Sequence, residues 1–190
     1  MEAYISLVTK KALSHSLKKI LTEKTLDKIT ISEICGNCGL NRQSLYYHFS
    51  NIFDLVSWTL KKDVIDQLKD KINYNGWQEG FTKVLFFCRD NKVMIYNLYH
   101  SQGRDVLEEG LREYVMDLPL KVIDDQISRF NIKVIEKSRV FIASYNMYAF
   151  VGIMMFWIDK DMEEEPCLLI KRIHTLIEGD FKKDLLSYSK

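Results

Sequence analysis

The chain has 190 residues, 47% of them hydrophobic, which is enough to bury a sizeable core in one large or two small domains. Only 2 prolines and 8 glycines interrupt long runs of helical periodicity, so the composition argues against a β-sandwich or barrel and predicts an all-α fold. The formal net charge is +1, yet residues 1–50 carry 7 Lys or Arg against 4 Asp or Glu, which gives them +3 and leaves −2 for residues 51–190. The basic excess favours contact of the first segment with phosphate groups.

The start of the chain does not have the pattern of a secretory signal peptide, because Glu2, Lys10 and Lys11 surround a short apolar patch. We therefore expect a cytoplasmic protein. In that compartment, the four cysteines are expected to be reduced thiols rather than a disulfide framework.

The first predicted helix spans about residues 4–22. Leu13, Leu17 and Ile20 recur at the spacing of one helix face, which predicts an apolar side that packs on the following segment. Four lysines lie on its other faces, where each is either solvated or close to a nucleic-acid backbone.

The segment from Thr30 to Phe49 has the local chemistry of two short helices joined by a turn. Thr30 and Glu33 have the spacing of a capping box, in which each side chain bonds to the other residue's backbone N–H. Asn41 is a second N-cap, and Gly39 suits the tight turn before it. A capped helix that opens Asn-Arg-Gln-Ser after such a turn can direct polar side chains at the edges of DNA bases.

This helix pair and its ending, Leu45-Tyr46-Tyr47-His48-Phe49, resemble the DNA-binding domain of the TetR family of bacterial regulators over about residues 5–60. The resemblance implies a three-helix DNA-binding domain over residues 1–50, with the recognition helix at the positions that match Asn41 to His48. Arg42 and Gln43 are implied to read bases, since Arg forks onto guanine and Gln pairs with adenine. The side chains implied to contact double-stranded DNA or to position the helix are Thr30, Asn41, Arg42, Gln43, Ser44, Tyr46, Tyr47 and His48.

One position departs from the family. Ile52 stands where the family usually has a lysine that approaches a phosphate. That contact is therefore missing, or it is supplied by Lys61 or Lys62.

Cys35-Gly-Asn-Cys38 has the spacing of half a zinc site or of a redox motif. No second Cys or His pair follows at ligand spacing, so we predict a packing role, with no metal and no cofactor. The four histidines are scattered, and neither a Ser-His-Asp or Cys-His arrangement nor a glycine-rich phosphate loop is evident. We predict that the chain is not an enzyme.

Residues 51–190 are predicted to form a helical regulatory and dimerisation domain. Aromatic side chains in its first half either pack in the core or line a cavity for a small-molecule effector. The candidates for the cavity are Phe86, Phe87, Tyr96, Tyr99 and His100. The run from Tyr74 to Gln78 also resembles a TetR subgroup that includes the activator of dihydroxyacetone kinase genes, which implies control by a protein coactivator as the alternative.

The run from Val140 to Ile158 has 19 residues without a formal charge, nearly enough to span a bilayer. Ser144 and Asn146 make it a poor membrane segment, so we predict a buried helix and no membrane contact. A last helix follows Pro166, and the two helices are expected to pair with those of a second copy in a four-helix bundle. The predicted interface residues are Tyr148, Val151, Met155, Leu169, Ile173 and Ile177.

The resemblance thus implies a TetR-type transcriptional regulator that binds a palindromic operator as a homodimer and responds to a small-molecule effector. Control through a protein coactivator is the alternative. An enzyme or a membrane-anchored protein is the alternative from outside this class.

Overall fold

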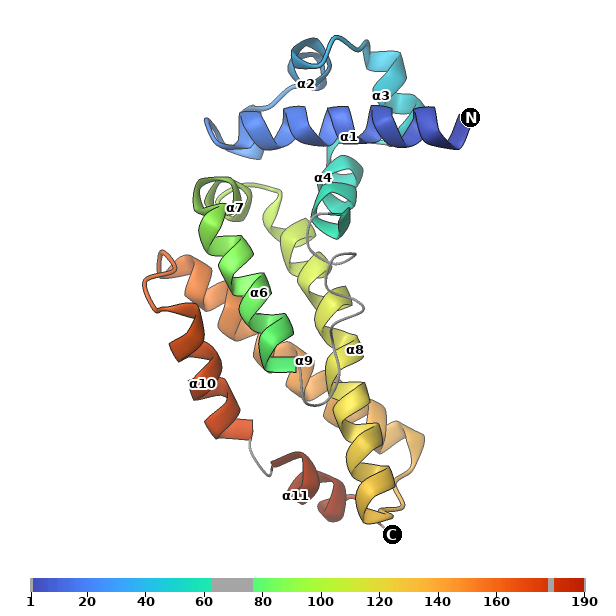
Figure 1. Cartoon of the computed structure of the whole chain (residues 1–190), viewed down its shortest axis with the longest axis vertical. Coiled ribbons are helices and arrows are strands. Elements are labelled where there is room, and N and C mark those ends of the chain that lie inside the picture. The colour runs from blue at the N-terminus through green and yellow to red at the C-terminus, as the bar shows by residue number, and fades with distance from the viewer. Residues whose placement is uncertain (1, 63–76, 178–179, 190) are drawn as a thin grey trace. The chain divides into compact units, whose positions relative to one another are not determined.

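The computed structural model describes residues 2–62, 77–177 and 180–189, and these ranges contain helices and no strands (Figure 1). The predicted all-α fold is confirmed. The chain forms two compact units: Met1–Asp66 with Asn91–Gly110, and Gln67–Asp90 with Leu111–Lys190. The first unit is thus larger than the DNA-binding domain predicted over residues 1–50, because a later segment joins it.

The first unit contains α1 (Glu2–Leu21), the 3₁₀ turn η1 (Leu26–Lys28), α2 (Ile31–Asn37), α3 (Arg42–His48) and α4 (Ile52–Leu60). Its core is built from the apolar faces of these helices, and the face of α1 is the one that the periodicity of residues 4–22 predicts. Leu13 and Leu17 of α1, Ile34 of α2, Leu45 of α3 and Leu55 of α4 have no exposed surface. The short helices α2 and α3 therefore keep their positions by packing on the long α1.

Helix α7 (Lys92–Tyr99) and the start of α8 (Arg104–Phe130) complete the first unit. The side-chain amide of Asn97 donates to the backbone oxygen of Leu21 at 2.8 Å. The backbone N–H of Gln102 donates to a carboxylate oxygen of Asp27 at 3.1 Å. These two bonds fix the α7–α8 turn to the end of α1 and to η1.

The second unit contains α6 (Trp77–Asp90), the rest of α8, α9 (Glu136–Asp159), α10 (Pro166–Ile177) and α11 (Asp180–Ser187). Phe81 of α6 stacks on Phe150 of α9, with ring centroids 4.8 Å apart. Arg139 of α9 donates to both carboxylate oxygens of Asp124 on α8, at 2.6 and 2.7 Å. Pro119 lies inside α8, which runs through it as a single helix.

Among the described helices, α9 is long and apolar enough to cross a membrane by length and composition, and 56% of its apolar window is buried inside the protein. This burial is that of a core helix. Residues 74–76 of the run that resembles the activator subgroup lie outside the described residues.

Gly103, at the start of α8, offers a test of this packing. A Cβ there would lie 2.9 Å from Leu98 and 3.0 Å from Leu26, both buried, whereas a Cβ at Gly110 would meet nothing within 4 Å. We expect Gly103→Ala to lower the free energy of unfolding by about 1–3 kcal/mol through overpacking. Gly110→Ala, the control, should raise it by about 0.5–1 kcal/mol. Urea denaturation of both variants measures the difference, and equal effects would contradict the packing described here.

Candidate nucleic-acid interface

The first turn of α2 is fixed by the residues that precede it. The Thr30 hydroxyl accepts from the Glu33 backbone N–H at 3.3 Å, which confirms the predicted N-cap. The Lys24 ammonium donates to both carboxylate oxygens of Glu33, at 2.7 and 2.8 Å. The pKa of the Glu33 carboxyl lies below its usual value, chiefly because of Lys24 and more weakly because of the Thr30 backbone N–H. This network holds the beginning of α2 in one position.

The turn between α2 and α3 has the predicted chemistry. Gly39 adopts a φ of +69°, a left-handed conformation that side chains disfavour. Asn41 then caps α3, because its side-chain oxygen accepts from the Ser44 backbone N–H at 2.8 Å and from the Ser44 hydroxyl at 3.1 Å. The start of α3 is therefore well defined, although the helix has only 7 residues.

Helix α3 presents one buried face and one exposed face. Leu45 has no exposed surface, and Phe49, which ends the helix, is 5% exposed. Ser44 and His48 are half-buried. The other predicted contact residues of the helix and its cap are exposed: Asn41, Arg42, Gln43, Tyr46 and Tyr47. Tyr47 is the more exposed of these two tyrosines, at 83%. An exposed row of amide, guanidinium and phenol groups suits contact with a polar partner.

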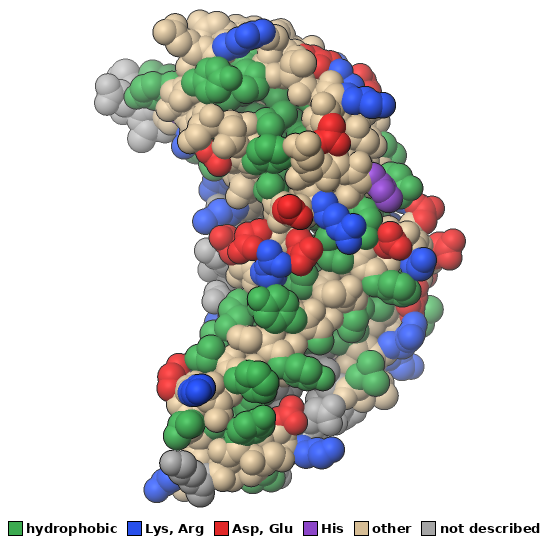
Figure 2. Space-filling view, turned by 180° about the vertical axis from the view of Figure 1, so that it is seen from behind, with side chains coloured by type: hydrophobic (Ala, Val, Ile, Leu, Met, Phe, Trp, Pro, Cys, Tyr) green, Lys and Arg blue, Asp and Glu red, His purple; other side chains and the backbone are tan. Residues whose placement is uncertain are grey.

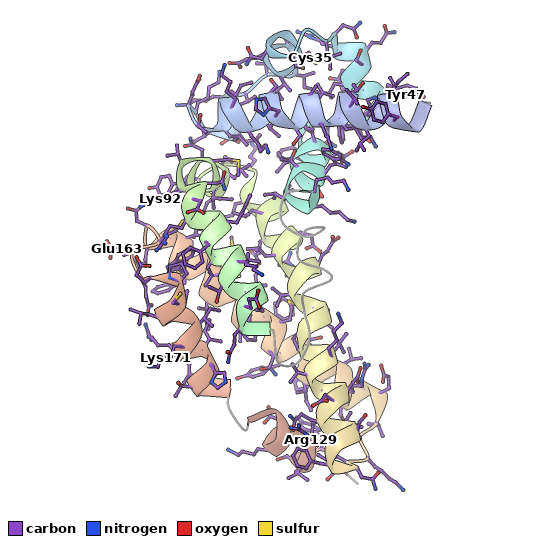
Figure 3. All side chains as sticks on the ribbon, in the orientation of Figure 1. Cys35, Tyr47, Lys92, Arg129, Glu163 and Lys171 are labelled. Atoms are coloured by element: carbon purple, nitrogen blue, oxygen red, sulfur yellow. The ribbon has the colours of Figure 1, made fainter. Side chains whose placement is uncertain are left out.

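A groove of about 620 Å³ runs between α1 and α3. Figure 3 shows Tyr47 beside the N-terminal part of α1, where the groove lies. Its lining residues are Ile5, Ser6, Thr9, Leu40, Asn41, Gln43, Ser44, Tyr47 and His48. Ile5, Ser6 and Thr9 of α1 were not predicted as part of this site, because no local pattern shows that residues about forty positions apart meet.

His48 connects this groove to α1. The Ser6 hydroxyl lies 3.5 Å from His48 Nδ1. Burial, followed by the positive charge of Lys10, lowers the pKa of the His48 imidazole below its usual value. The Lys10 ammonium also lies 5.7 Å from the centre of the Phe49 ring. One lysine of α1 is thus close to the end of α3.

Lys61 and Lys62, the residues predicted to replace the family's lysine at position 52, lie at the opposite end of α4 from Ile52. Ile52 is half-buried in the first turn of α4, which Asn51 caps by accepting from the Asp54 backbone N–H at 3.0 Å. Lys61 is exposed and Lys62 half-buried after the last turn of the helix.

Cys35 and Cys38 lie at the end of α2 (Figure 3 labels Cys35). Burial raises the pKa of both thiols, and the Cys38 thiol donates to the Ile34 backbone oxygen at 3.3 Å. Within the described part of the chain, no three His, Cys, Asp or Glu side chains are grouped as metal ligands would be. The positions of both thiols fit the packing role that the sequence predicts.

Comparison with known proteins identifies the family. A TetR family model, described as a transcriptional regulator C-terminal region, matches residues 75–179, more than half of the chain. The chain belongs to the TetR family of transcriptional regulators.

Several relatives of this TetR-family chain are known. DhaS of Lactococcus lactis, the transcriptional activator of the dhaKLM operon, is 24% identical over 152 residues, which cover 78% of each chain. The solved structure of DhaS, the dihydroxyacetone kinase operon activator, matches with a TM-score of 0.69 at 21% identity, over 97% of this chain and 99% of the other. NalD, the secondary repressor of the MexAB-OprM multidrug efflux pump in Pseudomonas aeruginosa, matches with a TM-score of 0.63 at 15% identity, over 90% and 95%. The predicted likeness to the dihydroxyacetone kinase gene activator is confirmed.

The predicted dimer-interface residues of this TetR-family chain lie mostly in its own core. Val151, Met155, Leu169 and Ile173 are each at most 6% exposed, because they pack inside the second unit. Of the predicted set, Tyr148 is 61% exposed, and the side chain of Ile177 lies outside the described residues.

The exposed apolar surface of α9 is formed instead by a row of four side chains on one face of the helix, spaced by four, three and eight residues. These side chains are 58–65% exposed: Phe141, Tyr145, Tyr148 and Phe156. Figure 2, drawn from behind, shows apolar side chains gathered over the lower half of its view. Gly152 is exposed between Tyr148 and Phe156, so the row has a flat position near its middle.

A groove of about 470 Å³ borders this row between α9 and α10. Leu169 and Ile173, two of the predicted interface residues, are among its apolar lining. The groove also has charged residues of both signs, among them Lys160, Glu164 and Arg172, and Arg172 donates to both carboxylate oxygens of Glu164 at 2.8 and 2.9 Å.

The predicted effector residues are divided between the two units. Phe86 and Phe87 are half-buried on α6, whereas Tyr96, Tyr99 and His100 belong to α7 and its end. The His100 ring lies 4.1 Å from the Tyr96 ring and 5.0 Å from the Tyr99 ring. None of the five residues lines either groove described above.

Proposed function

We propose that this TetR-family regulator acts in the bacterial cytoplasm and binds a palindromic DNA operator as a homodimer through α3 of each copy. The observation that carries the proposal is the two-sided character of α3. Leu45 anchors the helix in the core, while Arg42 and Gln43 are exposed in its first turn. The first turn of a recognition helix is the part that reaches base edges in the major groove.

The exposed groups divide into two chemical roles. Arg42 suits the O6 and N7 atoms of guanine, and Gln43 suits the N6 and N7 atoms of adenine. Ser44 and Tyr47 carry hydroxyls that suit phosphate oxygens, and Lys10 adds a positive charge beside the end of α3. The base contacts would set the sequence, and the phosphate contacts would set the register and the salt dependence.

Binding to a random pool of duplex DNA, followed by competition with single-position variants of the selected site, tests this proposal. Arg42→Ala and Gln43→Ala should each lose on the order of 1–3 kcal/mol of discrimination at one base pair of each half-site. Lys10→Ala should weaken binding to all sequences alike and reduce its salt dependence. Lys121→Ala, which removes an exposed lysine of α8, is the control and should change neither. Selection of no common sequence by the wild-type protein would contradict the proposal.

The proposed dimer is formed by the exposed row of α9. An exposed apolar row of this size indicates a surface that a partner covers. In a dimer with a two-fold axis, the row of each copy would pack on the same row of the other copy. If the two α9 helices cross antiparallel at Gly152, Tyr148 of the second copy lies opposite Phe156, since both residues are four positions from the crossing. Phe156 lines the groove between α9 and α10, so Tyr148 of the second copy would lie beside that groove.

Gly152→Leu tests the crossing. A Cβ at this position meets nothing within 4 Å in one copy, so the variant should fold normally. Sedimentation equilibrium should then find a mass near the 22.4 kDa of a single chain, while the wild-type protein has twice that mass. Operator affinity should fall as well, because a monomer has one DNA-binding head, the unit that contains α1 to α4, and can contact only one half-site. Ser128→Leu adds the same side chain to an exposed position of α8 and should leave the dimer intact. A dimeric Gly152→Leu variant would contradict this crossing.

Two modes of control are candidates, and an observation on α7 favours the second. A small-molecule effector would need a cavity lined by residues such as Phe86 and Phe87, which are half-buried on α6. A protein coactivator would need an exposed surface. Val93, Tyr96 and His100 are exposed on one side of α7, at spacings of three and four residues. Similarity to an operon activator also supports activation through a coactivator.

Ultrafiltration of an extract from the source cells distinguishes the two modes. If a coactivator acts, the retained protein fraction alone should change the occupancy of the operator, and Val93→Glu should abolish that response. Leu186→Glu, at an equally exposed apolar position of α11, is the control and should keep it. A response found only in the small-molecule filtrate would favour the effector instead.

A further inference from the structure

The side chain of Arg42 is bonded to another helix of the head. Its Nε donates to the hydroxyl oxygen of Ser32 at 2.5 Å. Arg42 opens α3 and Ser32 lies in the first turn of α2, so the bond joins the beginnings of two helices. In the part of the chain that the structure describes, Ser32 is the hydrogen-bond partner of this guanidinium.

The position of Ser32 is itself fixed. The neighbouring Thr30 caps α2, and the Lys24 ammonium binds the carboxylate of Glu33. Ser32 is half-buried between these two residues. Its hydroxyl is therefore a fixed acceptor, whereas an arginine on an unsupported surface samples many rotamers.

The electrostatics of α2 agree with this placement. Burial and the neighbouring Cys38 raise the pKa of the Cys35 thiol, and the positive charge of Arg42 opposes them. The guanidinium charge therefore acts on α2, as the bond to Ser32 requires.

A bond at Nε has a particular consequence for arginine. The guanidinium is planar, so fixing Nε fixes the plane in which the two terminal amino groups point. These terminal groups are the pair that donates to guanine O6 and N7 in a bidentate contact. A group held in its binding orientation before the DNA arrives loses less conformational entropy on binding.

We propose that Ser32 is a positioning residue that orients the guanidinium of Arg42 to read one base pair in each half-site. Ser32 thereby contributes to sequence specificity without touching a base. The inference rests on the DNA binding proposed above, and it adds an α2 residue to the specificity of the recognition helix.

The competing role for Arg42 is a phosphate contact, and the two roles differ in a measurable way. Loss of a base contact relaxes preference at one position, whereas loss of a phosphate contact weakens all sequences alike. A residue that only stabilised the fold would also act uniformly. The pattern over positions, rather than the affinity alone, therefore decides the role of Ser32.

The experiment uses the full-length protein and the duplex selected by the wild-type protein. The relative affinity of every single-position variant of that duplex is measured with wild type, Ser32→Ala and Ser32→Thr. Ser32→Ala should lose about 2- to 10-fold of discrimination at the position where Arg42→Ala loses it, in line with the loss of one ordinary hydrogen bond. Ser32→Thr keeps the hydroxyl and should restore most of that discrimination.

A double-mutant cycle supplies the control. Lysine has a methylene group in place of Nε and cannot donate from that position, so in an Arg42→Lys background the change Ser32→Ala should have no further effect on discrimination. Thr22→Ala removes another exposed hydroxyl of the head, which donates within its own segment, and should leave every position unchanged.

The outcomes separate this inference from the proposed function. If wild type selects a common sequence and Ser32→Ala discriminates as wild type does, or weakens all variants equally, the positioning role is wrong and DNA binding stands. If wild type selects no sequence at all, the proposed function fails, and this inference fails with it.

Discussion

The burial of Leu45 is the constraint on which the rest of the head depends. A helix of 7 residues is unstable by itself, so α3 needs packing and caps to exist. Leu45, with no exposed surface, fixes which side of α3 faces the core, and Asn41 fixes where the helix begins. The exposure of Arg42 and Gln43 follows from these two facts. The DNA-reading surface is thus a consequence of apolar packing behind it.

The head is also larger than its three N-terminal helices. Asn97 and Gln102 bond to the end of α1 and to η1, and the close approach at Gly103 leaves no room for a side chain. Helix α8 begins in this unit and continues as one helix into the other. A change that shifts the start of α8 would therefore act directly on α1, which supports α2 and α3.

In the second unit, both the core and the proposed dimer interface are built from apolar side chains of α9. Helix α9 is apolar on all sides, and its own chain covers the side with Val151 and Met155. The side with Tyr145, Tyr148 and Phe156 remains exposed. Such a surface is costly in water unless a partner covers it, which is why we assign it to a second copy. Tyrosines suit this place, since each combines a large apolar ring with a hydroxyl that stays hydrogen-bonded at the edge.

The sequence by itself determined the all-α fold, the N-caps of α2 and α3 and the turn at Gly39, because caps and helical periodicity are local properties. The tertiary structure decided which distant residues meet. No local pattern joins Ser6 to His48 or Ser32 to Arg42, since these pairs are 42 and 10 residues apart and lie on different helices. Periodicity also failed on α9, where apolar residues cover the whole circumference. In that case, only the packing of the other helices determines which side is core and which is exposed.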